Sequence, residues 1–139
     1  MTTVDKLLYT AKVHTTGGRD GASRSSDGNL DVKLATPGTG RASTNPEQLF
    51  AAGWSACFMS AIAFLAAQRK VSLSPGRYID AEVDLGTGEE GFFLRARLNV
   101  HLPGLDREVA QSLVDEAHEN TCPYSKATRG NIDVTISLV

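Results

Sequence analysis

Two cysteines are the side chains of this sequence best suited to chemistry. Cys57 and Cys122 lie 65 residues apart, so they form neither a CxxC redox motif nor a zinc-ribbon spacing. The three histidines, His14, His101 and His118, form no HxxxH pair. His118 and Cys122 stand four positions apart, but a zinc site usually takes at least three ligands from the protein. We therefore predict thiol chemistry, if any, with no metal and no cofactor.

The local sequence around each cysteine leaves its role open. Cys57 lies in the apolar segment AAGWSACFMSA, where a cysteine is most often a small, inert core residue. Cys122 lies in ENTCPYSKAT, just after an expected helix and before a proline. In a reducing compartment such cysteines are more often reactive or simply buried than joined in a permanent bridge. A reactive pair and two ordinary buried thiols are both consistent with these segments.

Composition places the chain among ordinary globular proteins. Its 139 residues, 41% of them hydrophobic, suffice for one domain, 1–139, whose core needs no disulfide or metal. A formal charge of −2 gives no electrostatic reason to expect nucleic acid or an anionic membrane as a partner. The first ten residues, MTTVDKLLYT, lack the basic segment and apolar stretch of a secretory signal. We expect a cytoplasmic protein.

Hydrophobic periodicity predicts an α+β fold with a mainly antiparallel sheet, in the order β-β-β-α-β-β-α-β. Apolar and polar residues alternate in Lys6–Thr16, which predicts a half-buried strand. The later elements are a hairpin of residues 79–85 and 92–102, a helix from Asp106 to about Glu119, and a closing strand over residues 132–138. The return strand of the hairpin should carry a solvent-exposed face of Arg95, Arg97, Asn99 and His101.

One long segment is helical in pattern and unusually apolar. Asn45, Pro46 and Glu47 are typical of an N-cap, a first-turn proline and a first-turn acid, and the helix should run to about Lys70. Residues 49–67 carry no charge, and ten of these nineteen are Ala, Gly or Ser. The stretch approaches the roughly 20 residues that span a membrane, but its small residues favour packing against protein. A helix that is apolar all round should be buried on every side, so we predict an intimate homodimer and no membrane.

Three segments together resemble the organic hydroperoxide resistance family, a branch of the Ohr/OsmC family. They are TGGRDG (16–21), NPEQLFAAGWSACF (45–58) and ENTCPYSKATRGNIDV (119–134), in matching order and spacing. The resemblance covers essentially the whole chain. It implies an OsmC-like fold, in which the sheet packs on central helices of an intertwined homodimer. Trp54 is a departure, because an aromatic such as Tyr is common in the family at this position.

The resemblance implies a thiol peroxidase without metal or haem. Cys57 would attack an alkyl or lipid hydroperoxide and become a sulfenic acid, and Cys122 would condense with it to a disulfide. Because burial raises the pKa of a thiol, such a site needs a nearby cation. The resemblance assigns that cation to Arg19, oriented by Glu47. Taken alone, Arg19 is also typical of a solvated turn, and Glu47 of a favourable charge at a helix start.

Helix geometry adds a condition to these roles. Glu47 and Cys57 are ten residues apart, or about 15 Å along an unbroken helix, so they cannot touch on one straight helix. We expect the helix to break near Ala51–Ser55, where Gly53 offers flexibility. Such a break would put Cys57 near the start of a second helix, whose partial positive charge favours a thiolate.

The substrate pocket should be apolar, because the alcohol released from an organic peroxide carries a hydrophobic tail. The candidate lining residues, each equally typical of plain core, are Phe50, Trp54, Phe58, Met59 and Tyr124. The resemblance also implies a dithiol reductant of the lipoyl type. Three alternatives stay open: an OsmC-type peroxidase with broader or hydrogen peroxide specificity, a non-catalytic protein that binds an apolar ligand, and a Cys–His hydrolase.

Overall fold

The computed structural model of the chain describes residues 2–139, which divide into two compact units between Pro46 and Glu47. Along the chain the elements follow the predicted order β-β-β-α-β-β-α-β, with three short helical segments added. The predicted α+β class is confirmed.

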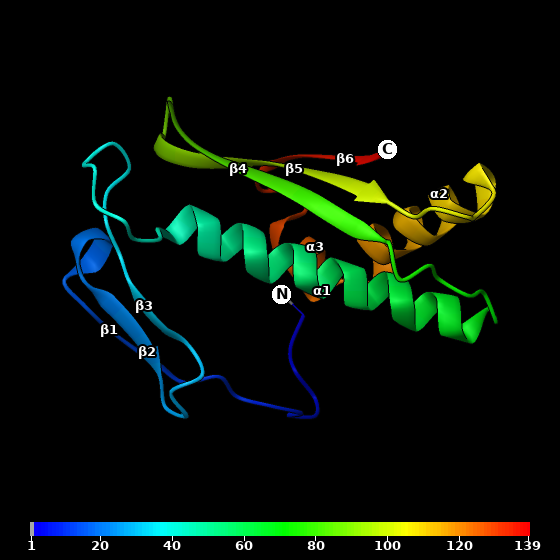
Figure 1. The fold of residues 1–139 in the computed structure, drawn as a ribbon, viewed down its shortest axis with the longest axis horizontal. Coiled ribbons are helices and arrows are strands. Elements are labelled where there is room, and N and C mark those ends of the chain that lie inside the picture. The colour runs from blue at the N-terminus through cyan, green and yellow to red at the C-terminus, as the bar shows by residue number, and fades with distance from the viewer. Residues whose placement is uncertain (1) are drawn as a thin grey trace. The chain divides into compact units, whose positions relative to one another are not determined.

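The first unit holds a small antiparallel sheet. Its strands β1 (Val13–Thr16), β2 (Ala22–Ser25) and β3 (Asp31–Lys33) lie in chain order (Figure 1). The prediction of a half-buried strand over Lys6–Thr16 is wrong, because only the last four residues form a strand and Leu7 is 72% exposed. Among residues 2–45 the only helical element is a three-residue turn, so this unit supplies no second layer that could bury the alternating side chains.

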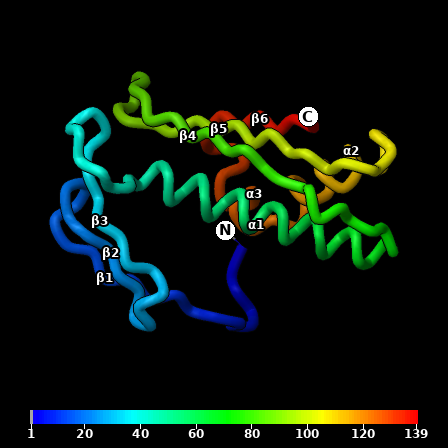
Figure 2. Tube along the Cα trace, in the orientation of Figure 1, coloured from blue at the N-terminus to red at the C-terminus, as the bar shows by residue number. Residues whose placement is uncertain are grey.

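The second unit packs helix α1 (Pro46–Gln68) along a three-stranded sheet (Figure 1; Figure 2). Strands β4 (Tyr78–Gly88), β5 (Gly91–His101) and β6 (Asp133–Leu138) lie in the order β4-β5-β6. β4 pairs with β5 in antiparallel fashion, whereas β6 pairs with β5 in parallel. The sheet is therefore mainly antiparallel, as predicted, with the central strand shared by both kinds of pairing.

The connection from β5 to β6 is mainly helical. It consists of α2 (Arg107–Glu116), a π-helical turn (Ala117–Thr121) and α3 (Pro123–Thr128). The predicted helix from Asp106 to about Glu119 thus ends three residues early as an α-helix and continues as the wider π-turn. Such turns shift the register of the residues that follow them, which matters for Cys122.

The core of the second unit lies between α1 and the central strand β5. The inward-facing residues of β5 are fully or almost fully buried, and they meet a row of large α1 side chains spaced about one turn apart. These residues are Ala96, Leu98 and Val100 of β5, and Trp54, Phe58 and Ile62 of α1. Every second residue of the strand and about every fourth residue of the helix point to the same side, so the two rows of side chains face each other.

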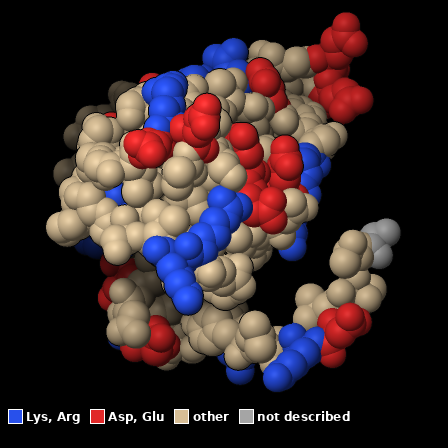
Figure 3. All heavy atoms as spheres, turned by 90° about the vertical axis from the view of Figure 1, so that its right-hand side faces the viewer, with Lys and Arg blue, Asp and Glu red and all other residues tan. Residues whose placement is uncertain are grey.

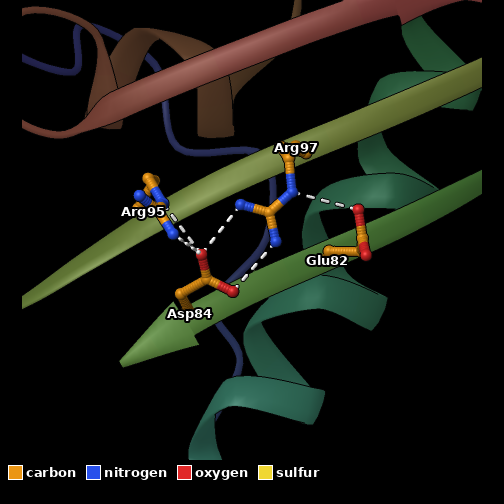
Figure 4. Close-up of polar contacts among 4 residues, drawn as sticks. All are labelled: Glu82, Asp84, Arg95 and Arg97. Atoms are coloured by element: carbon orange, nitrogen blue, oxygen red, sulfur yellow. Dashed lines mark hydrogen bonds and ion pairs between the residues drawn. The ribbon is translucent and has the colours of Figure 1, made fainter. Parts of the chain in front are cut away.

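The opposite face of the sheet is charged, as the alternation in β5 predicts. Arg97 donates two hydrogen bonds to Asp84, at 2.8 and 2.9 Å, and one to Glu82 at 3.0 Å (Figure 4). Arg95 also donates to Asp84, and the two arginines hold the pKa of this carboxyl well below its usual range. Acidic and basic side chains are likewise interspersed on the face drawn in Figure 3. Solvent screens such pairs, so they align the two strands more than they stabilise the fold.

Helix α1 is only partly covered by its own chain. By length and composition it could cross a membrane, a test that the core helix of a soluble protein also passes. One side packs into the core, and on the other side Phe64 is 56% exposed. The exposed positions on this side are Ala52, Ala56, Ser60, Phe64 and Ala67. Within one chain, the helix is therefore not buried on every side.

The predicted break in this helix is wrong. α1 runs without interruption from Pro46 to Gln68, through Gly53 and the whole Ala51–Ser55 segment. A glycine inside a helix costs only about 1 kcal/mol relative to alanine, and the surrounding alanines favour the helix. Cys57 accordingly lies in the middle of α1 and not at the start of a second helix.

Candidate active site

The two cysteines, 65 residues apart in sequence, lie side by side in the second unit. Cys57 projects from the middle of α1, and Cys122 is the residue directly before α3. Their sulfur atoms are 3.8 Å apart, and both thiols are free. Cys122 is completely buried, whereas Cys57 is partly exposed. Of the two cysteines, only Cys57 therefore retains solvent exposure.

The π-turn determines where Cys122 lies. The backbone N–H of Cys122 donates to the carbonyl of Ala117, five residues earlier, at 2.8 Å. Cys122 itself is extended, with φ −71° and ψ 119°, and Pro123 then starts α3 in a position that favours proline. The sequence signal for this arrangement is the Cys-Pro pair, because the residue before a proline is disfavoured in a helix.

The groups around Cys57 shift the pKa of its thiol in opposite directions. Burial raises the pKa of the Cys57 thiol, and the neighbouring Cys122 raises it further. The backbone N–H of Tyr124, in the first turn of α3, hydrogen-bonds the sulfur and acts against this rise. The helix start that faces the thiol thus belongs to α3, and not to a second helix after a break in α1. The net shift is upward, so these groups alone disfavour the thiolate.

Aromatic side chains of α1 and α3 surround this junction. The ring of Phe50 lies edge-on to Trp54 and to Tyr124, with ring centroids 5.7 and 6.2 Å apart. Trp54 and Phe58 are completely buried, which favours a core role for both. Phe50, Met59 and Tyr124 are less buried and so remain candidates for contact with a substrate. The pocket assignment of the five residues stays a prediction.

A buried hydrogen bond ties α1 to α3. The indole Nε1 of Trp54 donates to the hydroxyl of Ser125 at 3.3 Å, and both residues are completely buried. We did not predict this contact, because nothing in the local sequence pairs two residues 71 positions apart. It anchors the first turn of α3, and therefore the N–H that reaches Cys57.

Arg19 lies in the first unit, in a turn whose backbone requires glycine. Gly17 has φ +70°, and a Cβ on Gly21 would lie 1.6 Å from the carbonyl oxygen of Thr16. The next residue, Asp20, accepts hydrogen bonds from the backbone N–H and the hydroxyl of Thr36, which hold its pKa below the usual range. The turn that carries Arg19 is thus fixed in shape on both sides.

Glu47 lies in the first turn of α1, where its charge is favourable. Since α1 is unbroken, the ten residues between Glu47 and Cys57 correspond to about 15 Å along the axis. Glu47 can therefore act on the thiol only through another group. Arg19 belongs to the other unit, and its pairing with Glu47 or Cys57 stays a prediction.

Comparison with known proteins places this arrangement in a family. A family model described as OsmC-like protein matches residues 36–137. The chain is also 50% identical over 142 residues to the organic hydroperoxide resistance protein of Xanthomonas axonopodis pv. citri, with 99% of each chain covered. The chain belongs to the organic hydroperoxide resistance branch of the OsmC-like family. The resemblance predicted from the three sequence blocks is confirmed.

Solved structures from the organic hydroperoxide resistance branch share the fold. OhrB of Bacillus subtilis is 46% identical, with a TM-score of 0.89 over 96% of this chain and 100% of that chain. A protein of the same branch from Vibrio cholerae, with captopril bound in one of its active sites, is 38% identical. Its TM-score is 0.90 over 98% of this chain and 95% of that chain. The predicted OsmC-like fold is therefore confirmed.

Proposed function

We propose that this chain is a thiol-dependent peroxidase that reduces organic hydroperoxides to alcohols and thereby protects the cell from organic peroxide stress. The observation that carries this proposal is the 3.8 Å contact between the Cys57 and Cys122 sulfurs. The names of the relatives support the substrate class. Since the Vibrio cholerae relative holds captopril in an active site, the corresponding site here should also accept a small organic molecule.

The proposed reaction has two steps at sulfur. The Cys57 thiolate attacks the distal oxygen of ROOH, the O–O bond breaks, and the alkoxide takes up a proton and leaves as ROH. Cys122 then attacks the sulfur of the Cys57 sulfenic acid, the S–O bond breaks, and water leaves. The sulfurs must close from 3.8 Å to about 2.05 Å to form the disulfide. A dithiol reductant returns the two electrons.

Arg19 is proposed to supply the cation that the first step requires. Burial and Cys122 both raise the pKa of Cys57, so a thiolate at neutral pH needs a further favourable charge. The glycine-rich turn constrains the backbone that carries Arg19, and Glu47 is proposed to orient the guanidinium by a bidentate pair. In this scheme the two units act as one functional domain. Arg19→Lys should lose more reactivity than a charge-only role predicts, because lysine lacks the planar fork.

A homodimer is proposed to complete the cover of α1. The helix leaves a row of small residues and Phe64 exposed, and Phe92 at the β4–β5 hairpin is 78% exposed. Exposed apolar surface of this kind is typical of a protein–protein interface. Sedimentation should report a dimer, and Phe64→Glu should shift the protein toward monomer. A stable monomeric wild type would contradict this.

The reductant is proposed to be a lipoyl-type dithiol in the cytoplasm. Two electrons and two protons must reach the disulfide together, which a dithiol provides in one molecule. Reduction of the oxidised protein by dihydrolipoamide, glutathione and thioredoxin can be compared directly through recovery of thiols. Faster recovery with glutathione than with dihydrolipoamide would contradict the proposal.

The peroxidase proposal is tested by single-turnover oxidation. Reduced protein is mixed with about one equivalent of cumene hydroperoxide, and free thiols and disulfide are followed over time. We expect the wild type to lose both thiols, Cys57→Ser to lose none, and Cys122→Ser to accumulate a sulfenic acid that dimedone traps. Survival of the wild-type thiols would refute the proposal. Repeating the experiment with hydrogen peroxide separates an organic peroxidase from an OsmC-type enzyme of broader specificity.

A further inference from the structure

The side chain of Tyr124 rests on the bare backbone of Gly53. A Cβ placed on Gly53 would lie 2.6 Å from the Tyr124 hydroxyl oxygen, 3.1 Å from Cζ and 3.4 Å from Cε2. Separations under 3.0 Å are not tolerated by carbon atoms, so any larger residue at position 53 would displace the phenol ring. Gly53 is therefore not a hinge in α1, but the position that allows the ring to lie against the helix.

The ring packs on the turn of α1 that precedes the reactive Cys57. Gly53 is four residues before Cys57, one helical turn, and Phe50 is three residues before Gly53, so all three share one side of α1. The backbone N–H of Tyr124 bonds Cys57, while its ring reaches back to Gly53 and meets the Phe50 ring edge-on. Tyr124 is 38% exposed. Phe50 and Tyr124 thus form an aromatic surface beside the thiol.

The backbone of Tyr124 is held independently of its ring. The adjacent Ser125 is completely buried and bonded to Trp54, and Cys122 is held by the π-turn. The half-exposed ring, in contrast, can swing outward into solvent. A side chain at position 53 should therefore move the aromatic ring without moving the N–H that bonds the Cys57 sulfur.

We propose that Gly53 is a specificity-determining residue: by letting the Tyr124 ring pack against α1 and meet Phe50 edge-on, it creates the aromatic surface against which the organic group of a hydroperoxide binds. This inference rests on the proposed peroxidase function. As the distal oxygen approaches Cys57, the carbon substituent of ROOH lies over the two rings. Hydrogen peroxide has no such substituent and makes no use of the surface.

The test is Gly53→Ala, measured in single turnover so that no reductant is involved. The second-order rate of Cys57 oxidation by cumene hydroperoxide should fall about tenfold, the range that small changes in an apolar pocket produce. The rates with hydrogen peroxide and with iodoacetamide should stay within about twofold, because the thiol and its N–H contact are unchanged. Thermal stability should not fall, since alanine is the better helix former. Gly86→Ala, at a position with no atom within 4 Å of the new Cβ, is the matched control.

A second substitution tests the mechanism of the effect. Tyr124→Phe removes the oxygen that lies closest to the new Cβ, so Gly53→Ala with Tyr124→Phe should recover part of the rate with cumene hydroperoxide. Equal losses with both peroxides would overturn the inference, because Gly53 would then position the thiol. Unchanged rates in Gly53→Ala, or a double variant no faster than Gly53→Ala, would also overturn it. A wild type that reacts with neither peroxide would instead refute the peroxidase function itself.

Discussion

The buried hydrogen bond between Trp54 and Ser125 should make a measurable contribution to stability. Trp54→Phe removes the donor and leaves the Ser125 hydroxyl without it, at a cost of about 1–3 kcal/mol. The smaller ring also buries less apolar area and packs less closely, which lowers the free energy of unfolding by about 1–2 kcal/mol more. The serine hydroxyl can turn to a carbonyl in its own helix, which favours the lower part of the first range. We therefore expect a total loss of about 2–4 kcal/mol, with Tm lower by roughly 5–15 °C.

The hydrogen bond is isolated by a double-mutant cycle. Ser125→Ala is made alone and together with Trp54→Phe, and urea unfolding is measured at one protein concentration. Removing both partners leaves neither group unsatisfied, so the double variant should be more stable than the sum of the single losses predicts, by about 1 kcal/mol. Ile62→Val, in the same core two turns further along α1, should be additive with Ser125→Ala. Strict additivity of the Trp54 and Ser125 changes would refute the reasoning.

Three further predictions concern the thiol, the sheet and the glycine turn. Cys122→Ala should lower the apparent pKa of Cys57 in iodoacetamide alkylation, because Cys122 raises it; an unchanged pKa would mean that burial alone is responsible. The folded-state pKa of Asp84 is depressed, so its contribution to stability is complete above the unfolded value near 3.9 and is lost as pH falls through the folded value. The difference between wild type and Asp84→Asn in urea unfolding should accordingly be larger at pH 7 than at pH 2, and a constant difference would count against the ion pairs. Gly21→Ala should slow peroxide reduction sharply, because its Cβ has no room, whereas Gly18→Asn, with open space and a left-handed backbone that asparagine tolerates, should not. Equal activity of these two variants would show that the turn has no role in peroxide reduction.

Much of the fold follows from local sequence rules. The Asn-Pro-Glu run predicts the start of α1 at Pro46, because cap, proline and acid each act within one helical turn. The alternation in β5 separates Leu98 from Arg97 because successive strand residues point to opposite faces. Such rules fail where burial depends on a second layer, as for Leu7 in the first unit.

The parts that escaped prediction depend on residues far apart in the chain. A glycine in a helical pattern indicates flexibility unless the side chain that packs on it is known. For Gly53 that side chain is Tyr124, 71 residues away in the sequence. The π-turn before Cys122 differs from an ordinary α-helix by one extra residue, which no periodicity in a ten-residue helix can reveal. The functional pair was identified by resemblance, because the pattern around Cys57 alone also fits an inert core cysteine.

The contact between the two sulfurs should also affect how well Cys57 resists overoxidation when peroxide is in large excess. A sulfenic acid that meets a second peroxide becomes a sulfinic acid, a lesion that ordinary thiols do not repair. Here the competing partner is 3.8 Å away and sealed from solvent. Effective concentrations of well-oriented intramolecular partners reach about 10⁵ M, far above that of any dissolved oxidant. In the proposed reaction, disulfide formation should therefore outrun overoxidation, and the burial of Cys122 should protect the site from damage by excess peroxide.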